Sequence, residues 1–345
     1  MELITDPRLR EIVSYIAPMM EADPYPDVKI APDDPTEREA WFNDIARRRE
    51  QQHAVVRQMI GSSSAAPELP SGVEAIDVRI PVRGSCGSSG CEACSRGAIS
   101  AYVYRPIGAT GAPAYLTLHG GGWWLMGGDI LRNSGPSHAT MALDLGIVVV
   151  DVDYRLTPEH KFPLPVEDCY TALAWVAEHG NELGVDPARI AMGGASAGGN
   201  LTAAVALMTR DRGGPALRGQ AVQIPCLDSS CNTVSHRLCA TGYGTALDRW
   251  QKMWATYLRD PMDMYNPYAS PVHAASFADL PPALITVGDY DSLRDDGLIY
   301  AERLSEAGVS VTIRRFPQIH GGGLPKNGPQ LEKLTRDFLR ANLLN

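Results

Sequence analysis

The pattern of apolar and polar residues divides the 345-residue chain into a helical first part and an alternating second part. Near the start, apolar side chains recur at helical spacing at Leu9, Ile12, Val13, Ile16 and Met20. Residues three and four apart lie on one face of a helix, so this spacing predicts a helix with one buried face.

A start signal predicts a second helix in the first part. Asp34 offers a capping carboxylate, Pro35 suits the first turn, and Glu37 follows within that turn. The helix is expected to end before residues 61–67, because their Gly, Ser, Ala and Pro composition is typical of a linker.

From residue 73 onward, short apolar runs alternate with stretches of helical character. The predicted strands occupy residues 73–82, 99–105, 115–118, 147–150, 190–193, 222–225, 283–287 and 309–316. Helices are predicted at residues 168–179 and after the run at 190–193. This alternation is typical of an α/β fold with a mostly parallel central sheet, flanked by helices on both faces.

A G-x-S-x-G pentapeptide at residues 194–198 is the strongest chemical signal in the chain. A predicted strand precedes it and a helix-forming run follows it, which is the context of a nucleophile elbow. Ser196 is therefore the predicted nucleophile, and Gly194 and Gly198 would avoid collisions with neighbouring chain. A serine hydroxyl also needs a base, an acid that orients the base, and N–H donors for the oxyanion.

The glycine-rich run at residues 119–122 supplies candidate donors. It directly follows a predicted strand, and its glycines allow the backbone to approach a substrate carbonyl closely. The N–H groups of Gly121, Gly122 and Ala197 are the predicted oxyanion hole. The alternative is a flexible glycine turn without a chemical role, which the serine motif downstream disfavours.

His320 is the predicted general base among the eight histidines. It follows the last predicted strand, and sheet enzymes place catalytic groups in loops at the carboxyl ends of strands. His119 is expected to brace the glycine run. His53 falls on a predicted helix and is expected to be solvated, and a surface position is also expected for His236.

Four aspartates follow the predicted strand at residues 283–287. Asp295 and Asp296 suit the first turn of the next helix, where the helix dipole favours a negative charge. Spacing alone leaves Asp289 and Asp291 as alternatives for the acid. With a serine before and a histidine after, the chain order is that of the α/β-hydrolase fold.

Together these stretches resemble the hormone-sensitive lipase family of esterases (bacterial family IV), within the α/β-hydrolases. The resemblance is carried by residues 119–122, 153–160, 194–200 and 291–295 and by His320 with its following glycine. It implies the α/β-hydrolase fold. It also implies that Asp291, the first Asp of a D-P-L-R-D-like run, is the triad acid.

Three positions depart from the family pattern. Ala195 stands where Asp or Thr is usual, Ser292 replaces the usual Pro, and Gly322 follows His-Gly where Phe is usual. The departures leave every catalytic group in place. They bear on loop mobility and substrate preference.

The resemblance further implies a helical cap. Residues 1–72 and an insertion at about 226–275 would form it, on a catalytic domain of residues 73–345. The insertion lacks a strand pattern and carries aromatic residues at helical spacing, which fits either a core helix or a cap helix facing a pocket. On the second interpretation, the predicted substrate-binding residues are Trp123, Trp124, Trp250 and Trp254.

The predicted activity is that of a serine carboxylesterase acting on short- to medium-chain acyl esters. His320 would take the Ser196 proton, Asp291 would hold the imidazole, and an acyl-enzyme intermediate would form. An amidase or deacetylase of a small biosynthetic metabolite remains an alternative, because it would share every catalytic residue. A ligand receptor on the same fold is a further alternative, which the presence of His320 disfavours.

Charge and apolar content narrow the partners. A net charge of −9 argues against a nucleic-acid partner. No apolar run approaches the ~20 residues that span a bilayer, and the first residues lack the features of a signal peptide, so a cytoplasmic location is predicted. The expected partners are a small-molecule ester and, from the resemblance, a second copy of the chain in a homodimer.

Cys86, Cys91 and Cys94 form a C-x₄-C-x₂-C pattern in a glycine-rich loop. Three thiolates bind zinc when a fourth ligand completes the site, but the sequence offers no clear fourth ligand. A disulfide within the loop, or an insertion with incidental thiols, are the alternatives. The prediction is an enzyme that requires no cofactor, with structural zinc as a secondary option.

Overall fold

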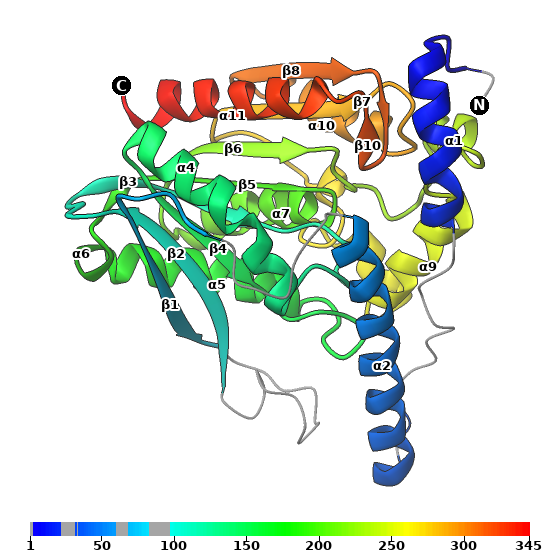
Figure 1. Ribbon diagram of the computed structural model, residues 1–345, viewed down its shortest axis with the longest axis horizontal. Helices are drawn as coiled ribbons and strands as arrows, with labels where there is room; N and C mark the ends of the chain where they lie inside the picture. Colours follow the sequence, from blue (N-terminus) through cyan, green and yellow to red (C-terminus); the bar gives the residue numbers. More distant parts are fainter. Residues whose placement is uncertain (1–2, 22–31, 33, 60–67, 83–96) are drawn as a thin grey trace.

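The computed structural model describes residues 3–21, 32, 34–59, 68–82 and 97–345. In these residues the centre of the molecule is an eight-stranded sheet in the order β1-β2-β4-β3-β5-β6-β7-β8 (Figure 1). The strands are β1 (Val73–Pro81), β2 (Ala98–Pro106), β3 (Ala112–Leu118), β4 (Val148–Asp153), β5 (Val185–Ala195), β6 (Leu217–Gln223), β7 (Ala283–Gly288) and β8 (Val311–Phe316). β2 runs antiparallel to both of its neighbours and the other pairs are parallel, which confirms the mostly parallel sheet.

Helices cover both faces of this sheet. One face carries α5 (Leu164–Glu178), α7 (Ala197–Arg212) and α10 (Arg294–Glu306). The other face carries α4 (Gly135–Leu145) and α11 (Asn327–Leu343). Residues 197–209 of α7 are all buried, because this helix lies between the sheet and the covering helices. The predicted α/β-hydrolase architecture is therefore confirmed.

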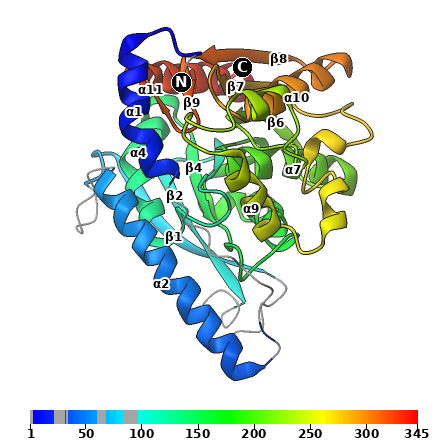
Figure 2. The same cartoon turned by 90° about the vertical axis from the view of Figure 1, so that its right-hand side faces the viewer.

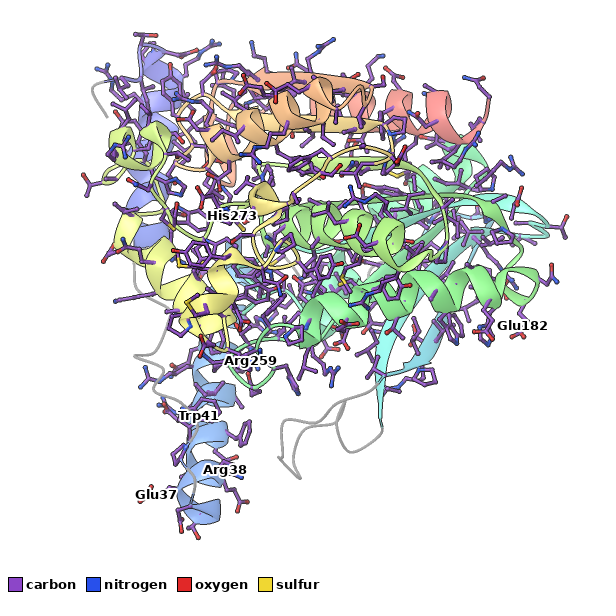
Figure 3. All side chains as sticks on the ribbon, turned by 180° about the vertical axis from the view of Figure 1, so that it is seen from behind. Glu37, Arg38, Trp41, Glu182, Arg259 and His273 are labelled. Atoms are coloured by element: carbon purple, nitrogen blue, oxygen red, sulfur yellow. The ribbon has the colours of Figure 1, made fainter. Side chains whose placement is uncertain are left out.

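Two helices precede the sheet, as the periodicity predicts. They are α1 (Pro7–Glu21) and α2 (Pro35–Met59), and Figure 2 shows both along one side of the molecule. The Asp34 carboxylate accepts hydrogen bonds from the N–H groups of Thr36 and Glu37, at 2.9 and 3.0 Å. The predicted capping interaction at the N-terminus of α2 is thus present. The first turns of α2, which carry the labelled Glu37, project away from the sheet in Figure 3.

The segment at residues 226–275 has helices and no strand. It contains α8 (Val234–Leu238), α9 (Leu247–Tyr257), η2 (Pro261–Tyr265) and η3 (Pro271–His273). The apolar side of α9 is buried, including Trp250 and Trp254. The division of the chain into a cap and a catalytic domain stays a prediction.

Several details differ from the sequence expectations. The strands predicted at 190–193 and 222–225 begin five residues earlier, as β5 and β6. The helix expected from residue 168 begins four residues earlier, at Leu164, and Gly180 opens the short helix α6 (Gly180–Leu183) rather than only ending α5. A small ribbon of β9 (Gln318–Ile319) and β10 (Gly322–Gly323) was not predicted, because two-residue strands leave no periodic signal. Residues 61–67 and the loop with Cys86, Cys91 and Cys94 lie outside the described residues, so the zinc option stays untested.

Candidate active site

The serine turn has the strained geometry that its motif predicts. Ser196 lies between β5 and α7 with φ 57° and ψ −116°, a left-handed φ that non-glycine residues rarely adopt. A Cβ on Gly194 would lie 2.5 Å from the Leu118 carbonyl oxygen, and one on Gly198 would lie 2.0 Å from it. Both glycines are required because the end of β3 crosses directly over the turn.

Three side chains that are distant in sequence meet at this turn. Ser196 Oγ lies 2.9 Å from His320 Nε2, and His320 Nδ1 lies 2.9 Å from Asp291 Oδ2. The exposed fractions of the three residues are 7%, 8% and 0%. The second Asp291 oxygen accepts the N–H of Leu293 at 2.8 Å, which fixes the carboxylate plane. His320 stands at the turn between β9 and β10.

The structure also separates the competing aspartates. Asp291 is the carboxylate that contacts the histidine, whereas Asp289 pairs with Arg315 at 2.7 Å near the surface. Asp295 and Asp296 lie in the first turn of α10, as their pattern predicts. Of the two aspartates that spacing leaves open, the one that contacts the histidine is the one that the family resemblance names.

The predicted oxyanion donors lie next to the serine turn. A Cβ on Gly120 would lie 2.9 Å from the Ala195 carbonyl oxygen, so the glycine run is pressed against the turn. Gly121 and Gly122 have φ values of 95° and 62°, which suit glycine. Within the described residues, the N–H groups of Gly121, Gly122 and Ala197 donate no hydrogen bond to the protein. They are therefore available to a ligand oxygen.

His119 braces the glycine run, as expected. Its ring stacks on Tyr154 with centroids 4.1 Å apart and planes at 7°, and its Nδ1 lies 2.8 Å from the Gly120 oxygen. The Tyr154 hydroxyl donates to the His119 carbonyl at 2.7 Å. Burial lowers the pKa of His119 and raises the pKa of Tyr154, so both side chains stay neutral near pH 7.

Arg49 is a residue at this site that sequence reasoning missed. It reaches from α2 and donates from Nε to the Trp124 carbonyl at 3.0 Å and from Nη2 to the Thr157 carbonyl at 2.7 Å. It also forms a bidentate pair with Glu159, at 2.7 and 2.6 Å. Its guanidinium carbon lies 4.4 Å from the ring centroid of Trp124. One partly buried arginine thus joins α2 to the segment that follows the oxyanion glycines.

A fully buried ion pair supports the same region. Arg155 donates from Nε and Nη2 to the two oxygens of Asp168, at 2.8 and 2.6 Å. Their exposed fractions are 4% and 1%. The pair ties the turn after β4 to α5, and the Thr157 N–H in that turn donates to the Trp123 carbonyl at 2.8 Å. The loop that presents the glycines is therefore held from behind.

The four tryptophans predicted to bind substrate are all buried. Their exposed fractions are 0%, 0%, 1% and 2%, for Trp123, Trp124, Trp250 and Trp254. Trp123 stacks on Tyr257 with centroids 4.1 Å apart, while Trp250 meets the His320 ring at 4.8 Å and 87°. A substrate-binding role for these four rings stays a prediction. The packing of Trp250 against His320 is a contact that the sequence did not predict.

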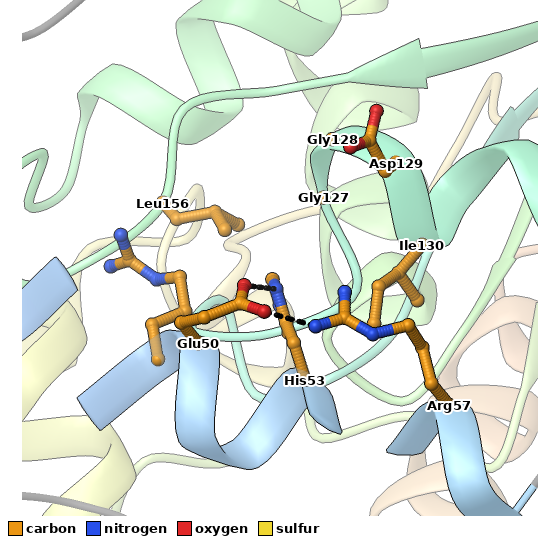
Figure 4. A pocket seen from close by; sticks show the side chains of 9 residues that line it. Glu50, His53, Arg57, Gly127, Gly128, Asp129, Ile130 and Leu156 are labelled. Atoms are coloured by element: carbon orange, nitrogen blue, oxygen red, sulfur yellow. Dashed lines mark hydrogen bonds and ion pairs between the residues drawn. The ribbon is translucent and has the colours of Figure 1, made fainter. Parts of the chain in front are cut away.

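The prediction that His53 and His236 are exposed is wrong. His236 is fully buried, and burial lowers its pKa. His53 lines a pocket of about 240 Å³ between α2 and residues 127–130 (Figure 4). Its side chain is 12% exposed and burial lowers its pKa to about 4. A helical position does not reveal which face of the helix a neighbouring segment covers.

Metal and membrane features are absent from the described part of the chain. No group of three or more His, Cys, Asp or Glu residues there is arranged to hold a metal ion. No helix there has the length and apolar character needed to span a bilayer.

Comparisons with known proteins agree with this geometry. Residues 115–322 match the family model described as alpha/beta hydrolase fold. The carboxylic ester hydrolase LipN of Mycobacterium tuberculosis is 40% identical over 234 residues, which are 66% of this chain and 61% of LipN. The arylesterase of Saccharolobus solfataricus is 37% identical over 244 residues, which are 69% of this chain and 78% of that protein.

A solved structure gives the same result over nearly the full length. A hyperthermophilic esterase from the archaeon Pyrobaculum calidifontis superposes with a TM-score of 0.77 at 32% identity, covering 97% of this chain and 98% of that one. By contrast, the aligned part spans about 61% of the length of LipN. From its matching family model, its relatives and its site geometry, the chain belongs to the α/β-hydrolase fold family, in the hormone-sensitive lipase group of esterases.

Proposed function

We propose that this protein hydrolyses carboxylic esters of short- to medium-chain acids through an acyl-enzyme on Ser196. The observation that carries the proposal is the continuous contact from Ser196 through His320 to Asp291. This contact lies beside three N–H groups that have no acceptor in the part of the chain that the structure describes. Relatives that are named esterases support the same reaction class.

In the proposed mechanism, His320 Nε2 accepts the Ser196 proton as Oγ attacks the ester carbonyl. The Asp291 carboxylate holds the imidazole by its Nδ1 and stabilises the imidazolium that forms. The charge that develops on the carbonyl oxygen is met by the N–H groups of Gly121, Gly122 and Ala197. His320 then protonates the leaving alcohol, and water repeats the sequence on the acyl-enzyme.

The chain-length proposal rests on the space around the histidine. The Trp250 indole occupies one side of the imidazole, and Trp254, four residues further along α9, packs with Trp123 and Tyr257 in one cluster. Bulky rings beside the reacting atoms favour a compact acyl group. We also propose that α2 and the segment at residues 226–275 act as the cap, because both send side chains to the loops of the site.

The test is hydrolysis of nitrophenyl acetate, butyrate, octanoate and laurate, with the matching anilides in parallel. We expect hydrolysis that favours the shorter esters, and Ser196→Ala to lower kcat by about 10⁵-fold or more. A fluorophosphonate should modify Ser196, as located by mass spectrometry. Anilide turnover that exceeds ester turnover would instead favour the amidase alternative, and a fully active Ser196→Ala would end the proposal.

A further inference from the structure

Ser292 links the loop that carries the acid to the segment at residues 226–275. Its hydroxyl accepts a hydrogen bond from Trp250 Nε1 at 2.7 Å, and its carbonyl accepts one from the Ser235 hydroxyl at 2.7 Å. Ser292 directly follows Asp291 and is 2% exposed. The two donors come from α9 and α8, so both helices of the segment bind this one residue.

Trp250 also contacts the base. Its ring and the His320 ring have centroids 4.8 Å apart and stand at 87° to each other. Edge-to-face pairs at this separation are favourable and directional. A single buried side chain therefore contacts the imidazole with its ring and binds the residue beside the acid with its N–H group.

We propose that Trp250 and Ser292 are positioning residues for the Asp291–His320 pair, an inference that rests on the proposed esterase function. The imidazole must direct Nδ1 at the carboxylate and Nε2 at the serine at the same time. The Trp250 ring limits rotation of the imidazole, and its bond to Ser292 fixes the loop that presents the carboxylate. The family usually has proline at position 292. Proline carries no hydroxyl that could accept this bond, so the link depends on the serine that this chain has instead.

Two single variants and their combination test the link. Ser292→Ala removes the acceptor and Trp250→Phe removes the donor while keeping an aromatic ring. We expect each to lower kcat about tenfold with KM changed less than twofold, because small displacements of reacting groups are costly. The midpoint of the acid limb of kcat/KM should move to lower pH, since a carboxylate held less closely favours charged imidazole less.

The combination separates a shared link from two independent effects. If the two residues act through one bond, the double variant should be no less active than the less active of the two single variants. Matched controls are Trp175→Phe on α5 and Ser305→Ala on the exposed side of α10, with thermal unfolding to confirm that every variant folds.

Three outcomes would overturn the inference. They are unchanged kcat and pH profiles in both single variants, losses that multiply in the double variant, or losses confined to KM, which would make Trp250 a substrate contact. A wild-type protein without ester turnover would overturn the proposed function instead, so the two failures are distinguishable.

Discussion

The oxyanion side and the acid–base side of the site are held in different ways. On the oxyanion side, backbone atoms of the glycine run contact the serine turn, and Arg49 binds the Trp124 and Thr157 carbonyls behind it. On the acid–base side, side chains of α8 and α9 bind the loop through Ser292. Substitution cannot remove the backbone atoms of the glycine run. The side-chain hydrogen bonds at Ser292, in contrast, can be removed one at a time by substitution.

The two sides also differ in the distance along the chain that their supports cross. Arg49 is 75 residues from Trp124 and 110 from Glu159, whereas Trp250 is 42 residues from Ser292. The oxyanion side therefore depends on correct packing of α2, an N-terminal helix that precedes the sheet in the chain. Three substitutions on the oxyanion side test this contrast, in order of decreasing expected effect.

Gly198→Ala should have the largest effect. The new Cβ would lie 2.0 Å from the Leu118 carbonyl oxygen and 2.6 Å from that of His119, and neither backbone atom can rotate away. Displacing the glycine run would cost at least one oxyanion donor, which is about 3–4 kcal/mol of barrier. We expect kcat to fall by about 10²–10³-fold or the soluble yield to collapse.

Gly328→Ala is the control for that substitution. Gly328 lies in α11 with nothing within 4 Å of its added Cβ, so helix propensity makes alanine neutral or favourable there. Normal activity of purified Gly198→Ala would mean that the backbone around the serine turn can accommodate the added Cβ. The contrast between the two sides would then not hold.

Local patterns carried most of what the sequence could predict. The serine turn, the glycine run and His320 each follow an apolar run directly, so short windows identify them. Asp291 needed the family resemblance, because several aspartates lie within reach of the same strand end. Contacts between distant segments left no such trace.

Arg49 shows why those contacts were missed. It is the last of three consecutive arginines, Arg47, Arg48 and Arg49, and only the packing of α2 shows which one turns inward. Trp250 was recognised as part of an apolar helix face, but spacing does not reveal that its N–H meets Ser292. Burial of His53 was missed for the same reason, since helix periodicity does not name the segment that packs on each face. His236 lies in a stretch without a predictive pattern, so its burial left no signal at all.

Arg49→Lys should have an intermediate effect. Lysine keeps the charge but not the planar fork that binds Glu159 and the Trp124 carbonyl together. We expect kcat to fall about tenfold and the affinity for a boronic acid transition-state analogue to fall in parallel, with KM little changed. Steady-state kinetics and inhibitor titration measure the three quantities.

Arg48→Lys is the matched control, because Arg48 pairs with Asp44 at 2.7 Å on an exposed part of the same helix. Surface pairs of this kind contribute about 0–1 kcal/mol, so its kinetics should match the wild type. Equal losses in both variants would assign the effect to α2 in general rather than to the Arg49 contacts.

The smallest expected effect is on stability and concerns His53, which lies on α2 and faces residues 127–130. Burial lowers its pKa from 6.5 to about 4, so the unfolded chain binds the proton more tightly than the folded one. The stabilising contribution of the neutral ring is complete above pH 6.5 and is lost as the pH falls towards 4. The full shift corresponds to roughly 3 kcal/mol, and partial exposure reduces the expected loss to about 1–2 kcal/mol.

His53→Gln should therefore lose about 1–2 kcal/mol less free energy of unfolding than the wild type between pH 7 and pH 4.5, measured by urea denaturation. Glutamine keeps polar atoms at the pocket but does not titrate. Other buried groups, including His236, titrate in both proteins, so the difference between the two curves isolates His53. Parallel curves would mean that protonation of His53 does not weaken the packing of α2, which would contradict this prediction.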